Sequence, residues 1–207
     1  MKKAASFAFV FIFAILLAAC STDGNITTDN KEGIYPYELS ERETTLLQAF
    51  GMEGNSQIIS FRAPREAIDL TVSVYRLDEN MEWSGIGGGG ISIGAEREPI
   101  DELAGTFTMQ LQDDYKIDFS ITAGGRASYT THAITLDTDI MASVKGFLTE
   151  FQKIEINKEI PVALMIYDSG TSMRSHSLDE YFEPSGFVGM DLVQVVTLTF
   201  GDGTVSP

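Results

Sequence analysis

The stretch "IDLTVSVYR", residues 68–76, decides the fold class of this chain. Side chains of an extended chain point alternately to opposite faces, so an apolar residue at every second position predicts a strand with one buried face. Here the apolar positions are Ile68, Leu70, Val72 and Val74. The residues between them are polar or, like Tyr75, amphipathic, and we expect them on the other face. The stretch therefore predicts a half-buried β-strand.

The same alternation recurs in three other stretches and makes the chain mainly β. They are "TFTMQLQ" at 106–112, "YKIDFSIT" at 115–122 and "LVQVVTLTF" at 192–200. The pairs Asp113-Asp114 and Gly124-Gly125 mark turns on either side of the second stretch. Further strands are expected at 57–62, 81–85, 91–94, 126–136, 154–156 and 162–167. With one buried face per sheet, the pattern favours an all-β fold, an antiparallel β-sandwich of two sheets packed face to face.

One or two short helices and a single helical turn are expected beside the strands. Ser40 and Glu43 have the spacing of a capping box, and Gly51 follows as a helix end. Ser177 and Glu180 repeat that spacing before a single turn. Between 140 and 151 the apolar residues fall at helical spacing, which favours a short helix there.

Charge limits the partners of the chain. Its 207 residues include 30 acidic and 14 basic side chains, a formal net charge of −16. A surface this acidic repels phosphate backbones, which excludes nucleic acid as a partner. It also argues against electrostatic adhesion to anionic lipids. The length is that of one domain with extensions.

The first 20 residues have the layout of an export signal. Lys2 and Lys3 precede an apolar stretch, residues 4–19, that is shorter than the roughly 20 residues needed to span a bilayer. Leu17-Ala18-Ala19-Cys20 closely resembles the lipobox of bacterial lipoproteins. The resemblance implies cleavage before Cys20, acylation of its sulfur and attachment of the mature chain to the outer side of a bacterial membrane. A conventional secretory signal with a leftover thiol is the alternative.

These features divide the chain into three parts. Residues 1–19 are expected to form the lipoprotein signal peptide, residues 20–37 a lipidated polar tether, and residues 38–207 a single β-sandwich domain. The bilayer is then a partner through the acyl chains on Cys20. Whether that bilayer is an inner or an outer membrane is left open.

The glycine-rich stretch "WSGIGGGGISIG", residues 83–94, contains two motif matches. Gly85, Gly87 and Gly90 fit the dinucleotide fingerprint, and the residues around Ser92 fit the G-x-S-x-G elbow of hydrolases. Both motifs require a helix directly afterwards, and the sequence that follows favours a strand. We therefore expect a flexible glycine loop joining two strands, with no cofactor. A Ser92 hydrolase, served by His132 or His176 with Asp137 or Asp168, remains as an alternative.

Metal sites have weak support in the sequence. Two histidines and one cysteine cannot supply three soft ligands for zinc, because Cys20 is committed to the lipid. Asp137 and Asp139 are the calcium candidates, but no twelve-residue EF-hand loop is present. A solvated acidic turn is the favoured interpretation of both residues. A glycosidase-type pair of carboxylates depends on spatial separation, which the sequence does not give.

Aromatic residues point to a binding function. Sugars stack on exposed Trp and Tyr rings, and Trp83, Tyr75 and Tyr129 are the candidates for such a platform. Burial of the lone Trp83 in the core is the competing interpretation. The leading hypothesis is a non-enzymatic module that binds a glycan or a protein. An envelope hydrolase and a purely structural envelope component are the alternatives.

Overall fold

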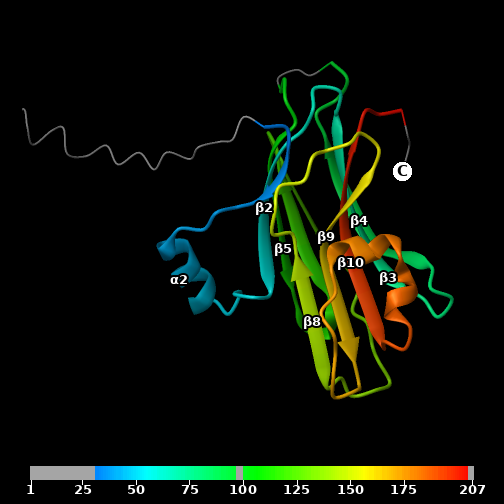
Figure 1. The fold of residues 1–207 in the computed structure, drawn as a ribbon. Helices are drawn as coiled ribbons and strands as arrows, with labels where there is room; N and C mark the ends of the chain where they lie inside the picture. Colours follow the sequence, from blue (N-terminus) through cyan, green and yellow to red (C-terminus); the bar gives the residue numbers. More distant parts are fainter. Residues whose placement is uncertain (1–30, 97–99, 205–207) are drawn as a thin grey trace, which may run out of the picture. The chain divides into compact units, whose positions relative to one another are not determined.

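The computed structural model describes residues 31–96 and 100–204. Within them it shows two five-stranded antiparallel sheets with few helical elements, which confirms the predicted all-β antiparallel sandwich (Figure 1). The predicted signal peptide, Cys20 and most of the predicted tether lie outside the described residues. None of the helices in the described ranges has the length and apolar character needed to cross a bilayer.

The two sheets, called A and B here, have five strands each. Sheet A has the order β1 (Gly33–Pro36), β2 (Ser56–Arg62), β5 (Ala104–Leu111), β6 (Ile117–Thr122) and β7 (Arg126–Thr130). Sheet B has the order β4 (Trp83–Ser92), β3 (Asp69–Leu77), β10 (Leu192–Gly201), β9 (Glu159–Asp168) and β8 (Ala142–Phe147).

The main core fills the space between the sheets. Leu70, Val72 and Val74 of β3 are fully buried in it, as their alternation predicts. Across the interface the ring of Phe61 meets that of Phe200 edge to face, with 5.5 Å between the centroids. Burial of apolar surface contributes roughly 25 cal/mol per Å², so this layer is the main source of stability.

A second, smaller core covers part of the outer face of sheet B. Two 3₁₀ helices, η3 (Leu178–Phe182) and η4 (Pro184–Phe187), supply the buried rings of Tyr181 and Phe187. They pack against outward-facing side chains of the sheet, among them Leu164, Ile166 and Val195. The expectation of one buried face per sheet is therefore wrong for the centre of sheet B, because β9 and β10 are covered on both sides.

Both capping boxes form. Helix α2 (Glu41–Ala49) begins after Ser40, whose Oγ accepts a hydrogen bond from the Glu43 amide while the Ser40 amide donates to Glu43 Oε2 at 2.8 Å. It is followed by Gly51, which has a φ of +67°. The Ser177–Glu180 pair caps η3 in the same way. The predicted helix and helical turn are confirmed.

Other expectations about local structure are wrong. The helix expected between 140 and 151 is strand β8, because pairing with β9 outweighs the helical spacing and Gly146 weakens a helix. The expected glycine loop is the middle of one continuous strand, β4. Residues 154–156 lie in no strand. Strand β1 begins at Gly33, so part of the segment assigned to the tether pairs with β2.

Candidate functional site

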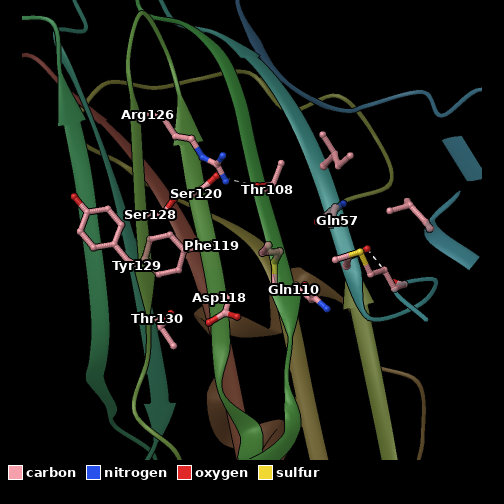
Figure 2. A pocket seen from close by; sticks show the side chains of 15 residues that line it. Gln57, Thr108, Gln110, Asp118, Phe119, Ser120, Arg126, Ser128, Tyr129 and Thr130 are labelled. Carbon is pink, nitrogen blue, oxygen red and sulfur yellow. Dashed lines mark hydrogen bonds between the residues drawn. The ribbon is translucent and has the colours of Figure 1, made fainter. Parts of the chain in front are cut away.

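A groove lies on the outer face of sheet A, beside α2 (Figure 2). Its volume is about 450 Å³, within the range of small-molecule sites. Polar side chains of β5, β6 and β7 line one part of it, while Leu47 of α2, Met52 of the following turn and Ile58 of β2 contribute apolar surface. The groove is therefore a candidate functional site.

The groove floor follows from a repeated three-residue pattern. The stretches 106–108, 120–122 and 128–130 read Thr-Phe-Thr, Ser-Ile-Thr and Ser-Tyr-Thr. Because successive strand residues point to opposite faces, the middle residue faces the other sheet and the hydroxyls face outward. Phe107 and Ile121 are indeed fully buried. Three neighbouring strands thus each present hydroxyl groups on one face.

Strand register arranges these groups in rows. Thr108 lies opposite Ser120, which lies opposite Ser128; in the next row Gln110 lies opposite Asp118 and Asp118 opposite Thr130. Directly opposite side chains are about 5 Å apart at Cβ. Thr108 Oγ1 and Ser120 Oγ share a hydrogen bond of 3.2 Å. The floor is therefore a regular array of hydrogen-bonding groups.

The array contains one charge of each sign. Arg126 of β7 is exposed, and Figure 2 shows its side chain extending across the face toward Ser120 and Thr108. Asp118 accepts a hydrogen bond of 2.9 Å from Gln112 Nε2 through Oδ2. The guanidinium offers several donors in a fixed fork, and the carboxylate offers several acceptor sites. The groove can thus hydrogen-bond a ligand that both donates and accepts.

The structure separates the three aromatic residues proposed as a platform. Trp83 and Tyr75 belong to sheet B, where Trp83 Nε1 donates to the Tyr181 carbonyl at 2.9 Å and its ring lies 5.2 Å from that of Tyr181. Trp83 is half-buried and packs against the smaller core, so it is neither an open platform nor a fully buried core residue. Tyr129 lies on β7 of sheet A. The three rings therefore do not form one surface.

Tyr129 joins the edges of the two sheets. Its ring stacks on Phe119 with 5.3 Å between centroids, and its hydroxyl donates to the Gly90 carbonyl at 2.9 Å. A Cβ on Gly89 would lie 2.4 Å from Tyr129 Cε1. The glycine run in β4 therefore allows this close approach, which is a structural use that neither motif match anticipated.

The residues of the alternative hydrolase are not assembled. Ser92 Oγ donates to the Ile68 carbonyl at 3.1 Å and accepts from the Gly94 amide at 3.1 Å. His176 is buried, with Nδ1 2.9 Å from Glu180 Oε2, and its ring packs on Phe187. His132, Asp137 and Asp139 are exposed, and Asp168 is half-buried at the end of β9. Ser92 thus bonds to backbone, while His176 bonds to Glu180.

The structure gives no support to Asp137 and Asp139 as calcium ligands. Thr138, between Asp137 and Asp139, donates to Asp191 Oδ1 at 3.2 Å. The Ser169 amide donates to Asp191 Oδ2 at 2.6 Å, and this bond lowers the pKa of Asp191 most. In the part of the chain that the structure describes, no three His, Cys, Asp or Glu side chains are grouped to hold a metal ion.

One polar cluster was not anticipated from the sequence. The hydroxyls of Tyr75 and Tyr181 each donate to the Glu159 carboxylate at 2.5 Å, and Thr197 Oγ1 donates to it at 3.4 Å. Burial, followed by the hydrogen bond to Glu159, raises the pKa of both tyrosines, so both remain neutral donors. The cluster fastens η3 to sheet B. Its members are too far apart in sequence to form a motif.

Comparisons of this chain with protein-family models, with curated proteins and with solved structures find no match.

Proposed function

We propose that this chain is a lipid-anchored, non-enzymatic binding protein whose outer sheet A groove receives a segment of glycan. Acyl chains on Cys20 hold the domain at the outer side of a bacterial membrane. The observation that carries the binding proposal is the groove itself, with its rows of hydroxyls, one charge of each sign and an apolar wall.

Sugar chemistry matches this lining. A sugar ring offers hydroxyls that donate and accept hydrogen bonds, and it also has apolar C–H faces. Asp118, Arg126 and the Ser/Thr rows suit the hydroxyls, and Leu47 suits the C–H faces. A volume of about 450 Å³ lies within the range of small-molecule sites, which suits a short glycan.

A binding role fits the chemistry better than hydrolysis does. The hydroxyl of Ser92 is occupied by backbone groups, and the carboxylate of Glu159 accepts from two tyrosines outside the groove. Within the groove the lining includes hydroxyls, amides, one carboxylate and one guanidinium, a set suited to hydrogen-bonding a ligand. These observations support a module that holds its ligand without changing it.

The groove is tested on a glycan array with the mature chain carrying Cys20→Ala. We expect binding to a glycan, and we expect Arg126→Ala to weaken it about 10- to 100-fold, because hydrogen bonds to charged groups contribute about 1.5–3 kcal/mol. Arg65→Ala is the matched control, since it removes an equally exposed guanidinium elsewhere. Equal losses in the two variants, or no glycan bound, would refute the site.

The anchor is supported by the lipobox resemblance and tested separately. Two or more acyl chains hold a protein durably, at about 0.8 kcal/mol per buried CH₂. We expect an alkyne fatty acid to label the protein in cells and Cys20→Ala to abolish the label. A mature protein that is found free in the culture fluid and begins at another residue would contradict the anchor.

A further inference from the structure

Helix α2 presents apolar side chains to solvent. Phe50 at its C-terminal end is 75% exposed and Leu46 is 57% exposed, and no residue of the helix is buried. Single exposed apolar residues are ordinary, but residues four apart share one helix face. Arg42 lies four residues before Leu46 on that face. We call the stripe formed by Arg42, Leu46 and Phe50 the α2 stripe.

We infer that the α2 stripe is a second membrane contact, which enters the headgroup region of the bilayer that holds the Cys20 lipid. This inference rests on the proposed anchor. Lys31 is the first described residue, so residues 20–30 link the anchor to the domain. Even fully extended, a segment of that length spans at most about 40 Å. The lipid therefore keeps the start of the domain close to the bilayer surface.

Short-range contacts hold α2 at the start of the domain. Only four residues separate β1 from α2, and Tyr37 among them donates a hydrogen bond of 3.1 Å from its hydroxyl to Glu43 Oε1. Glu43 also closes the capping box with Ser40. The helix is thus held at the anchored end of the domain. Leu47 lines the groove, whereas Arg42, Leu46 and Phe50 are not among the residues that line it.

The chemistry of the stripe suits a bilayer interface. An amphipathic helix lies in the interface when its apolar side chains reach the boundary of the acyl chains and its basic residues meet the headgroups. Leu46 and Phe50 supply the first contact and Arg42 the second. Glu38, Glu41 and Glu53 lie nearby, so anionic lipids should weaken the contact.

Two other exposed apolar residues provide matched controls. Phe182 is 62% exposed and Val188 is 66% exposed. Both belong to the η3–η4 segment, which covers sheet B, whereas α2 borders the groove on sheet A. Phe182 and Val188 are about as exposed as Leu46 and Phe50 but lie over the other sheet. They therefore distinguish a bilayer contact from a general effect of exposed apolar side chains.

The chain allows single-site labelling. Cys20 is its one cysteine, and acylation blocks that sulfur, so Phe50→Cys or Val188→Cys adds the sole reactive thiol. Each variant is labelled with an environment-sensitive fluorophore and inserted as full mature lipoprotein into phosphatidylcholine nanodiscs. We expect the emission of a probe at position 50 to shift to the blue and to be quenched by a doxyl-labelled lipid. We expect neither effect for a probe at position 188.

The outcomes separate the two proposals. If the protein does not co-migrate with nanodiscs, the anchor fails and this inference fails with it. If it co-migrates and the probe at position 50 keeps the emission maximum that it has in water, only this inference fails. A blue shift that depends on protein concentration and is insensitive to doxyl lipid would assign the α2 stripe to a second copy of the chain, and would also refute it.

Discussion

The outer faces of the two sheets differ although their inner faces share one core. On sheet A, β5, β6 and β7 present hydroxyl, amide and charged groups toward the groove. On sheet B, η3 and η4 cover the corresponding face with buried rings. One face is available to a ligand and the other is used for stability. The same sandwich therefore combines an open polar surface with a second hydrophobic core.

This difference is only partly visible in the strand sequences. Strand β5 alternates strictly, with Phe107 and Met109 inside and threonines outside. Strand β9 is apolar almost throughout, whereas β10 is buried over most of its length although it includes Gln194, Thr197 and Thr199. A strand buried on one face alternates, whereas one buried on both faces is continuously apolar. Alternation alone therefore does not identify the free face, because β3 of sheet B also alternates.

The largest expected effect concerns the cover of sheet B. Phe187 is buried against Trp83 and His176, so Phe187→Ala should lower the free energy of unfolding by about 3–5 kcal/mol. Phe182→Ala is the control, because its side chain is largely exposed. Urea unfolding of both variants measures the difference. Equal, small losses would mean that η4 does not contribute a core.

A smaller effect is expected where the edges of the sheets meet. Gly89→Ala places a Cβ against the Tyr129 ring, which Phe119 and Gly90 hold in place, and should cost about 1–3 kcal/mol. In Gly85→Ala the new Cβ would lie 4.0 Å from Tyr75, an ordinary contact. Thermal unfolding should therefore separate the two variants. Tolerance of alanine at position 89 would refute the close approach.

Acid should weaken the cover of sheet B. Hydrogen bonds from His176 and the Ser177 amide lower the pKa of Glu180 in the folded state. The stability it contributes is complete above its unfolded pKa of about 4.3 and is lost as the pH falls through the lower folded pKa. In Glu180→Gln this contribution is missing. The melting temperatures of this variant and of wild type should therefore converge only as the pH falls below about 4.3, with Glu183→Gln, an exposed neighbour, as control.

The smallest effect is expected on the open face. Thr108→Ala removes one hydroxyl from the groove floor, and its bond to Ser120 is only half-buried. Unfolding should change by no more than about 0.5 kcal/mol, because surface substitutions rarely exceed that. Glycan affinity should fall nonetheless. A destabilised variant with normal affinity would show that the hydroxyl array serves the fold rather than a ligand.

Much of the fold was predictable because local pattern and final burial agree. The alternation around Val72 and the capping box at Ser40 each depend on neighbours in sequence. Errors arose where a distant partner decides the outcome. Residues 142–147 form a strand because β9 lies beside them, and the glycines of β4 pair with β3. No local pattern contains that information.

The candidate site was less predictable than the fold. The repeated Ser/Thr pattern of β5, β6 and β7 was visible, but its meaning depends on the order of the strands in sheet A. The aromatic residues were chosen for their chemistry alone, and Trp83 and Tyr129 lie on different sheets. Which side chains share an exposed face depends on the order in which the strands pair. For this reason residue type identified candidates without placing them together.

The proposal that the sheet A groove binds a glycan is tested most directly by mapping the ligand onto one of the two outer faces. Backbone amide NMR shifts of the mature chain with Cys20→Ala are recorded while a glycan that binds on the array is added. We expect shifts concentrated in β5, β6 and β7, including Ser120 and Arg126. Shifts confined to η3, η4 and β4 would place the ligand on sheet B and contradict the proposal.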